Sequence, residues 1–563
     1  MDQAMFAEVL AHDAALVRAG LEIWIGAEPT FTNPRSQHPC WLSEALGSEK
    51  EAHARALLHA LAPSLAGSVQ LLKVEGRQYP GESAPRWCYG ALFDRRGPAN
   101  ASRPYSADME GDLSATPIPT ETQAWLTVTP DPAVVEINMA PAHDLATFAR
   151  WSEAVYAAAA EAGLAPLRFR YNGDVTDSGG GGQITLGGPT PARSPFLLRP
   201  QLLPGMVRYF NRHPSLSYLF APAVCGSASQ GPRPDETVGE RFEELPVALD
   251  YLAARGDAAT PAEIWGMLAP LLVDASGCSH RAELNVEKLW NPWFSGRGQL
   301  GLVELRALRM PASPARLTAL AALFRAVAAR LAKAPYLEPI VHWGSQLHDR
   351  FGLPWYLERD LEGVLTDLHA HGLGLGPKLR AELLARPEPL LTLKLEAASL
   401  EIRPALSFWP LVGDVAAQGA SGSRLVDSSS QRLQVIARAQ RGVALGRVAA
   451  NGWRMPLSAL PDEAGQQRAI GSVLYRSFVP MPGLHPAIGA HDPLTIEWQR
   501  QSGCARAQLY SWRPGGGAYS GLPHDQAEAE RRRSERALVS SGQPGEIRPS
   551  LASGSMLDLR RQY

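Results

Sequence analysis

Apolar and charged positions alternate along the segment from Cys278 to Met310. The first half alternates with a period of two, which is typical of a β-strand. Its polar side carries Arg281, Glu283, Asn285 and Glu287. In the second half Glu304 and Arg306 share one face of a further predicted strand. If the two strands share a sheet, their charges crowd together, which is costly unless they bind metal, phosphate or one another. A solvated, salt-bridged face is the alternative interpretation.

Two earlier segments also present an acid on a predicted strand. Residues 21–31 alternate and end near Glu28, and residues 127–139 place Glu136 and Asn138 on one face. Helical spacing of apolar residues predicts helices at 3–19, 48–66, 144–163 and 314–334. A strand followed by a covering helix indicates a sheet with helices packed on one face, an α+β architecture.

The pattern changes near Leu391, where short alternating runs separated by turn residues predict a small all-β module, a sandwich or partial barrel. Near the end, a charged stretch precedes a segment rich in Ser, Gly and Pro, which predicts a short helix followed by disorder. The predicted domains are therefore residues 1–385, a β-rich module at 386–520, and a charged, partly disordered tail at 521–563.

Charge and cysteine content narrow the classes of function. The 563 residues have a formal net charge of -2, which argues against nucleic acid or an anionic membrane as a partner. The five cysteines are odd in number and include no C-x-x-C pair, which fits a reducing compartment and no structural zinc. We find no secretory leader and no uninterrupted run of about 18 apolar residues. A soluble cytoplasmic protein is expected.

Four consecutive glycines, residues 179–182, precede Gln183 and a predicted strand at Ile184. Glycine lets backbone amides approach an anion closely, so Gly180 and Gly181 are candidates for nucleotide binding together with Gln183. The run is not a P-loop, because no G-x-x-x-x-G-K-[ST] motif occurs. A flexible linker is the alternative.

The acids on the predicted strands suggest phosphate chemistry. Hard divalent ions such as Mg²⁺ take oxygen ligands and share them with substrate phosphates. Arg281, Lys288 and Arg306 would neutralise phosphoryl oxygens beside such ions. This combination suits ATP-driven activation of an acyl group.

Longer motifs, spread in order over most of the chain, carry a resemblance to a known family. They are Gly26–Phe31, Tyr79–Trp87, Thr129–Asn138, Gly179–Gly188, Ser194–Pro200, His213–Phe220, Ser229–Arg233, His280–Glu283, Leu302–Arg306, Trp343–Phe351 and Val426–Ser429. With these motifs the chain resembles the bacterial amidoligases of the glutamine-synthetase-like class, a domain often fused C-terminal to a transglutaminase-like domain. The transglutaminase half is absent from this chain.

The resemblance implies an antiparallel sheet whose concave face holds ATP and Mg²⁺. The implied activity is that of a carboxylate-amine ligase, which phosphorylates a carboxylate to an acyl phosphate and lets an amine displace the phosphate. The implied metal ligands are Glu28, Glu136, Asn138, Glu283 and Glu304. Arg306 resembles a phosphate clamp that also contacts the nucleotide, with Lys288 and Arg281 as further catalytic cations. Arg199 and Arg233 are the candidates for holding the substrate carboxylate.

The implied substrates are an amine and a small-molecule, peptide or protein carboxylate, and the implied partner proteins are separate transglutaminase-like or ATP-grasp proteins. Two positions depart from the family. Gln183 ends the glycine run where relatives have Asn-His, and Arg513 precedes Pro-Gly-Gly where relatives have His. Glutamine can offer an oxygen to a hard ion but cannot titrate near neutral pH.

These departures leave two functions open: a ligase with different substrates, and a catalytically lapsed binding or scaffold protein. A hydrolase or transglutaminase is disfavoured, because Cys278 beside His280 shows no other sign of a nucleophile pair.

Overall fold

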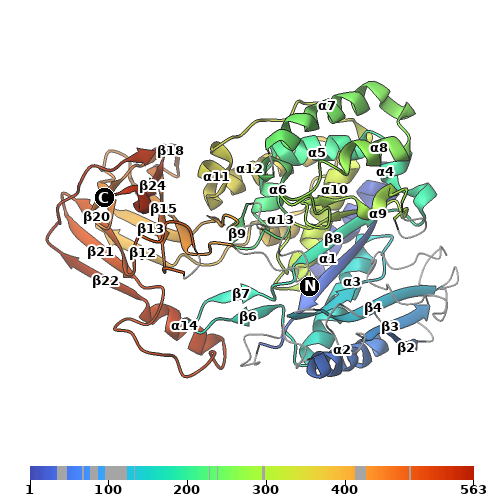
Figure 1. Cartoon of the computed structure of the whole chain (residues 1–563), viewed down its shortest axis with the longest axis horizontal. Helices are drawn as coiled ribbons and strands as arrows, with labels where there is room; N and C mark the ends of the chain where they lie inside the picture. Colours follow the sequence, from blue (N-terminus) through green and yellow to red (C-terminus); the bar gives the residue numbers. More distant parts are fainter. Residues whose placement is uncertain are drawn as a thin grey trace.

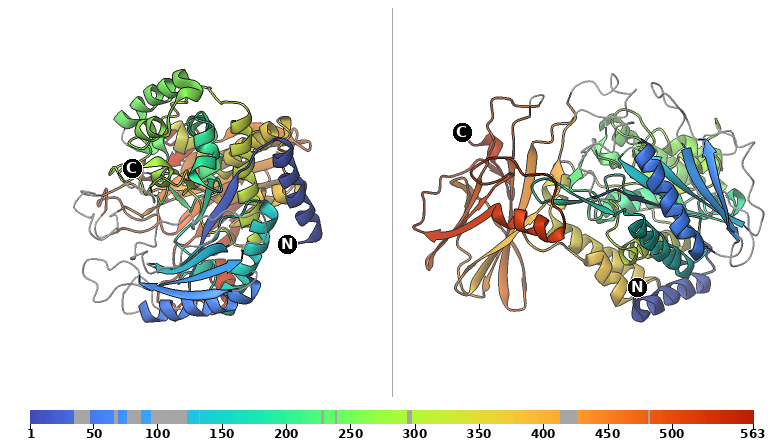
Figure 2. Two further views of the ribbon diagram at one scale, coloured as in Figure 1. Left: turned by 90° about the vertical axis from the view of Figure 1, so that its right-hand side faces the viewer. Right: turned by 90° about the horizontal axis from the view of Figure 1, so that it is seen from below.

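The computed structural model describes residues 1–34, 47–65, 69–75, 87–94, 123–131, 133–226, 229–237, 239–293, 298–412, 426–480 and 483–563. The motif from Tyr79 to Trp87 lies outside the described residues except for its last position. An N-terminal α+β part and a C-terminal β-rich part lie side by side along the longest axis of the molecule (Figures 1 and 2). The α+β class predicted from the sequence is confirmed.

An antiparallel sheet of eight strands forms the centre of the N-terminal part, in the order β10-β11-β8-β1-β5-β4-β3-β2. The strands are β1 (Trp24–Phe31), β2 (Gln70–Glu75), β3 (Trp87–Asp94), β4 (Gln123–Asp131), β5 (Val134–Asn138), β8 (Gly182–Gly187), β10 (Leu284–Asn285) and β11 (Val303–Leu305). The predicted acid-bearing strands therefore belong to one sheet.

Four long helices bury the apolar face of this sheet: α1 (Gln3–Arg18), α2 (Gly47–Leu61), α3 (Leu145–Glu161) and α10 (Pro314–Lys333). Their starts follow from local chemistry, because Asp2, Asp144 and Ser313 each accept a hydrogen bond from a backbone N–H in the first turn. The alternate strand residues Ile25, Ile137 and Ile184 pack into this core. The opposite face is left to polar side chains.

The remaining helices of this part include α5, α7 and α8, which gather above β8 in the view of Figure 1. They are α4 (Pro195–Leu198), α5 (Leu202–Arg212), α6 (Ser215–Tyr218), α7 (Gly239–Arg255), α8 (Pro261–Leu268), α9 (Glu287–Trp290), α11 (Gln346–Phe351), α12 (Pro354–Ala370) and α13 (Pro377–Leu384). A hairpin of β6 (Leu167–Phe169) and β7 (Val175–Asp177) extends from this part toward the C-terminal one (Figure 1).

The segment predicted as a strand over residues 281–287 is much shorter in the structure. Only Leu284–Asn285 pair with β11, and Glu287 begins helix α9. The side-chain oxygen of Asn285 accepts a hydrogen bond from the backbone N–H of Glu287 at 2.8 Å. Such a local bond turns the chain away from the sheet, which sequence alternation alone does not reveal.

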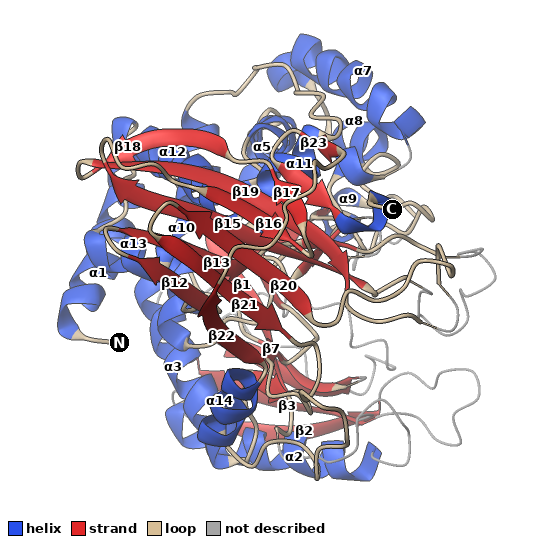
Figure 3. Cartoon of the chain, turned by 90° about the vertical axis from the view of Figure 1, so that its left-hand side faces the viewer, coloured by secondary structure: helices blue, strands red, loops and turns tan. Residues whose placement is uncertain are grey.

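The C-terminal part is a β-sandwich, as predicted for the region after Leu391. One sheet contains β12 (Leu391–Leu395), β13 (Ala398–Pro404), β15 (Ser430–Gln440), β18 (Ser458–Glu463) and β19 (Gln466–Arg476). The other contains β16 (Arg447–Ala450), β17 (Trp453–Met455), β20 (Leu494–Arg500) and β21 (Gly503–Leu509). Figure 3 shows both sheets. Trp498 is completely buried in the core they share.

The tail predicted as partly disordered is ordered instead. After the expected short helix α14 (Gln526–Glu535), β22 (Ala537–Gly542) pairs with β21, and β24 (Met556–Asp558) pairs with β19. A short strand, β23 (Ala552–Ser553), pairs with β24. The prediction was wrong because polar composition cannot show that a segment gains order by completing a distant sheet. The predicted boundary near residue 520 therefore falls inside the β-rich part.

Backbone pairing and buried charge join the two parts. The short strands β9 (Val224–Cys225) and β14 (Ser407–Phe408) pair in parallel across the predicted boundary at residues 385–386. The buried guanidinium of Arg432 donates to the carbonyls that end α11, His348 O and Asp349 O. Arg532 and Arg533 of α14 donate to carbonyls in the turn of the β6–β7 hairpin.

Among the described residues, no helix combines the length and the apolar composition that crossing a membrane requires.

Leu557→Ala tests the order of the tail. Leu557 is fully buried in the sandwich core, so its truncation is expected to lower the free energy of unfolding by about 2–5 kcal/mol. The matched control is Leu551→Ala in the same tail, where the leucine is 68% exposed and the change should stay within about 0.5 kcal/mol. Chemical denaturation measures both, and equal small effects would mean that the tail is not packed.

Candidate active site on the polar face of the sheet

The strand register brings the predicted acids to one face. Glu28 of β1 lies opposite Gln183 of β8, and Glu304 of β11 lies opposite Thr185 of β8. On the other side of β1, Thr30 lies opposite Glu136 of β5. Residues directly opposite in a sheet point to the same side, as do residues two positions apart on one strand. Glu28, Glu136 and Glu304 therefore share the face that the long helices leave uncovered.

Lys288 lies between two of these carboxylates. Its Nζ is 3.4 Å from Glu28 Oε1 and 3.4 Å from Glu304 Oε2. Arg306 Nη1 donates to the other oxygen of Glu304. Both carboxylates are almost completely buried. Burial opposes ionisation of Glu304, but the charges of Arg306 and Lys288 outweigh it and hold its pKa below the ordinary value.

A second chain of polar contacts continues from Arg306 to the rim of the site. Arg306 Nη2 is 3.2 Å from His280 Nε2, and His280 Nδ1 is 3.3 Å from Glu287 Oε2. Glu287 also accepts hydrogen bonds from Ser279 and Asn285. Burial raises the pKa of Glu287, but these bonds, led by that from His280, lower it to about 2. His280 is half exposed and can therefore meet a ligand.

Oxygen donors surround the carboxylates. Asn138 donates through Nδ2 to Glu136 Oε1 at 3.2 Å. The other amide atom, Asn138 Oδ1, is buried and accepts no hydrogen bond from the described part of the chain, and the same holds for Thr185 Oγ1. Carboxylate, amide and hydroxyl oxygens are the ligands that Mg²⁺ prefers. The donor set of this face fits a hard divalent ion.

Close packing explains why the run before β8 consists of glycines. A Cβ on Gly180 would come within 2.9 Å of the Thr30 side chain, and a Cβ on Gly182 within 2.3 Å of Pro311. Gly181 has φ +89°, which favours glycine, and its carbonyl accepts a hydrogen bond from Thr30 Oγ1 at 2.6 Å. The loop therefore lies against β1 beside Glu28.

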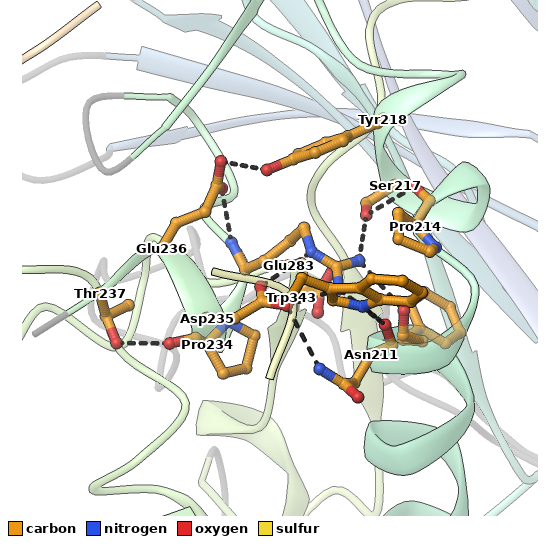
Figure 4. Close-up of polar contacts among 12 residues, drawn as sticks. Asn211, Pro214, Ser217, Tyr218, Pro234, Asp235, Glu236, Thr237, Glu283 and Trp343 are labelled. Atoms are coloured by element: carbon orange, nitrogen blue, oxygen red, sulfur yellow. Dashed lines mark hydrogen bonds and ion pairs between the residues drawn. The ribbon is translucent and has the colours of Figure 1, made fainter. Parts of the chain in front are cut away.

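The guanidinium of Arg233, which the sequence analysis predicts to hold a substrate carboxylate, is fully buried and bound by protein groups. It binds both oxygens of Asp235 at 2.9 Å, the carbonyls of Phe210 and Asn211, and the hydroxyl of Ser217. Glu283 Oε2 lies 3.7 Å from Arg233 Nη1. Three residues that contact this group, Ser217, Asp235 and Glu283, are labelled in Figure 4.

Glu283 consequently differs from the other predicted metal ligands. It forms an ion pair with Arg233, whereas Glu28 and Glu304 contact Lys288. Burial raises the pKa of Glu283 to about 7, although Arg233 acts in the opposite direction. Glu283 therefore belongs to the buried polar cluster around Arg233.

The other predicted cations lie nearer to solvent. Arg199 ends helix α4 and is exposed. Arg281 is half buried, and burial followed by the charge of Arg306 lowers its pKa. Of the two predicted departures from the family pattern, Gln183 pairs directly with Glu28, whereas Arg513 lies in an exposed turn after β21. Gln183 therefore belongs to the acidic face of the sheet.

Sequence reasoning missed two contributors to this site. Thr185 lies two positions after Gln183 on the same strand, so the period of two could have identified it. His280 appears in the sequence analysis beside Cys278 and in the motif His280–Glu283, but its contact with Arg306 depends on the pairing of β10 with β11. The local sequence pattern does not predict such a contact.

Fold and site together define an α+β protein whose antiparallel sheet buries one face under helices and presents carboxylates and cations on the other. The chain belongs to the amidoligase family described as "Putative amidoligase enzyme (DUF2126)", whose model matches residues 4–104 and 109–560. The match continues through the β-sandwich and nearly all of the tail, so the family unit includes both.

Two solved structures of GmaS are similar to this chain. "Apo GmaS without ligand" is 13% identical, with 67% of this chain and 71% of that chain covered and a TM-score of 0.28. "GmaS/ADP complex-Conformation 1" is 12% identical, with 67% and 72% covered and a TM-score of 0.30. No curated protein matches the sequence.

The raised pKa of Glu283 predicts a specific pH dependence of stability. The folded state binds the proton more tightly than the unfolded state, so this group makes the free energy of unfolding fall as pH rises from about 4.5 to about 7. Glu283→Gln should remove that fall, which is on the order of 1–3 kcal/mol. The measurement is the difference in unfolding free energy between the two proteins at several pH values.

Glu388→Gln is the control for this comparison, because Glu388 is exposed and its replacement should leave the pH profile unchanged. A difference between wild type and Glu283→Gln that does not vary with pH would show that folding does not raise the pKa of Glu283.

Proposed function

We propose that this protein is an ATP- and Mg²⁺-dependent carboxylate-amine ligase that forms an amide or peptide bond through an acyl phosphate. The observation that carries the proposal is the arrangement of Glu28, Lys288, Glu304 and Arg306 on one buried sheet face. Membership of an amidoligase family supports the reaction class. The sequence analysis predicts a cytoplasmic location, and a reaction that uses ATP would be consistent with that location.

The proposed reaction has two steps. A substrate carboxylate oxygen attacks the γ-phosphorus of ATP, and the bond from that phosphorus to the β-phosphate bridging oxygen breaks to release ADP. The amine then attacks the acyl carbon, phosphate leaves, and the amine loses a proton. Positioning and charge neutralisation account for most of the catalysis in phosphoryl transfer. Arg306 and Lys288 are the residues that would bind the transferring phosphoryl oxygens.

The metal would be held by Glu28, Glu136 and Glu304, with Asn138 as a supporting ligand. Bound Mg²⁺ would neutralise phosphate oxygens. Gln183 would offer a neutral oxygen beside Glu28, so it cannot act as the acid or base of the reaction. The exposed Arg199 remains the candidate for binding the substrate carboxylate, which could belong to a small molecule, a peptide or a protein.

One observation favours the alternative, a catalytically lapsed binding or scaffold protein. The Lys288 ammonium lies between Glu28 and Glu304 and already supplies the positive charge that a metal would bring. In a ligase, Lys288 would move toward the phosphates when nucleotide and metal bind together. In a scaffold protein it would stay between the carboxylates, and the face would bind no nucleotide.

Titration calorimetry of ATP, with and without Mg²⁺, separates these functions. We expect binding that requires Mg²⁺ and that weakens at least about tenfold in Glu304→Gln, because an anionic ligand is lost from the metal. Glu401→Gln is the control, since Glu401 is an acid of the β-sandwich paired with Arg403 and Arg438. Absence of ATP binding under every condition would contradict the ligase function.

Hydroxylamine offers a direct test for the activated acyl group. It replaces the amine substrate and converts an acyl phosphate into a stable hydroxamate. With a panel of amino acids and peptides as carboxylates, we expect hydroxamate and ADP in equal amounts, and a loss of both by at least about 100-fold in Arg306→Met. ADP formed without hydroxamate would indicate hydrolysis of ATP alone and would exclude the acyl phosphate.

A further inference from the structure

We propose that Cys225, Glu236 and His348 form a second metal site, which binds Zn²⁺ where the N-terminal part meets the β-sandwich. The three residues come from separate segments: β9, the short 3-10 helix Pro234–Glu236, and α11. One ligand atom of each lies within 4.8 Å of the others. This inference is independent of the proposed ligase activity, because none of the three residues belongs to the polar face of the sheet.

Glu236 is held in place at the centre of this group. His348 Nε2 lies 2.9 Å from Glu236 Oε1, and the hydroxyl of Tyr218 donates to the same oxygen. The backbone N–H of Arg233 donates to Oε2 at 3.1 Å. Figure 4 shows the Tyr218 hydroxyl directed at Glu236. The carboxylate is therefore oriented before any ion arrives, which lowers the entropy cost of binding.

The buried charge of Glu236 also favours a bound cation. The Glu236 side chain is only 1% exposed, and the ion pair recorded for it in the described part of the chain is with a histidine. The guanidinium of Arg233 is committed to Asp235 and Glu283. A buried carboxylate is costly unless a cation compensates it. A divalent ion would provide that compensation whatever the protonation state of His348.

The kinds of ligand atom in this group favour Zn²⁺ over Mg²⁺. Thiolate sulfur, imidazole nitrogen and carboxylate oxygen are the ligands of Zn²⁺, whereas Mg²⁺ prefers oxygen ligands alone. Tetrahedral Zn²⁺ with bonds of about 2.0–2.3 Å needs ligand atoms about 3.3–3.7 Å apart, so shifts of about 1 Å suffice. Binding would release the Cys225 thiol proton and place the imidazole proton on Nδ1. Water or the Tyr218 hydroxyl would take the fourth position.

The location of the site suggests its effect. Cys225 lies on the strand that pairs with β14, and the His348 ring contacts Phe408 of β14 with centroids 4.7 Å apart. His348 O also accepts a hydrogen bond from Arg432 of β15. A metal at this point would fix the contact between the two parts of the chain. The absence of a C-x-x-C pair does not argue against it, because its ligands are distant in sequence.

Spectroscopy of the full-length wild-type chain tests the proposal first. Co²⁺ substitutes for Zn²⁺, and a bound Cys225 thiolate gives a sulfur-to-Co²⁺ charge-transfer band. We expect this band to saturate at about one ion per chain, to persist in excess Mg²⁺ and to disappear when Zn²⁺ is added. Zn²⁺ is also expected to raise the Tm of the wild-type protein.

Variants then locate the site. Cys225→Ser should abolish the charge-transfer band, and His348→Gln should weaken Zn²⁺ binding at least about 100-fold. Cys504→Ser is the control, because it removes a buried cysteine of the β-sandwich and should leave the band unchanged. Wild-type protein that gives no band and no Zn²⁺-dependent rise in Tm would overturn the proposal, as would a band that survives in Cys225→Ser. Glu236 and His348 would then form an ion pair only.

Discussion

The interaction on which the polar face of the sheet depends is the buried ionic contact of Lys288 with Glu28 and Glu304. Two carboxylates from strands separated by β8 cannot both be buried and charged without a cation between them. The cation reaches them because the chain leaves the sheet after Asn285 and begins α9, which carries Lys288. The site therefore depends on the short strand β10 and on the turn that follows it.

The opposite face of the sheet is constrained by the burial of apolar side chains. The alternate residues of β1, β5 and β8 are apolar and fill a core against α1, α3 and α10. A slip of one residue in the register would exchange this core with the charged face, so burial on one side fixes the position of the acids on the other. Gly180 and Gly182 serve the same geometry, because a Cβ at Gly180 would collide with Thr30 and a Cβ at Gly182 would collide with Pro311.

These two constraints explain what the sequence could predict. Alternation shows which residues of a strand share a face, so the grouping of Glu28, Glu136 and Glu304 followed from it. The buried position of Arg233 did not, because its partners Asp235, Ser217 and Glu283 fix it through contacts among separate loops and helices. The order of the tail was likewise hidden, since β22 and β24 gain partners only in the folded sandwich.

Charge balance also constrains how ligands can enter the polar face. In the described part of the chain, the carboxylates of Glu28 and Glu304 contact the cations Lys288 and Arg306. The ATP polyanion entering alone would add repulsion, and a metal alone would compete with Lys288 for the same oxygens. Entering together, nucleotide and metal largely cancel each other's charge, and the phosphates offer Lys288 new partners. In the proposed ligase, this charge pattern would favour joint binding of metal and nucleotide over binding of either one first.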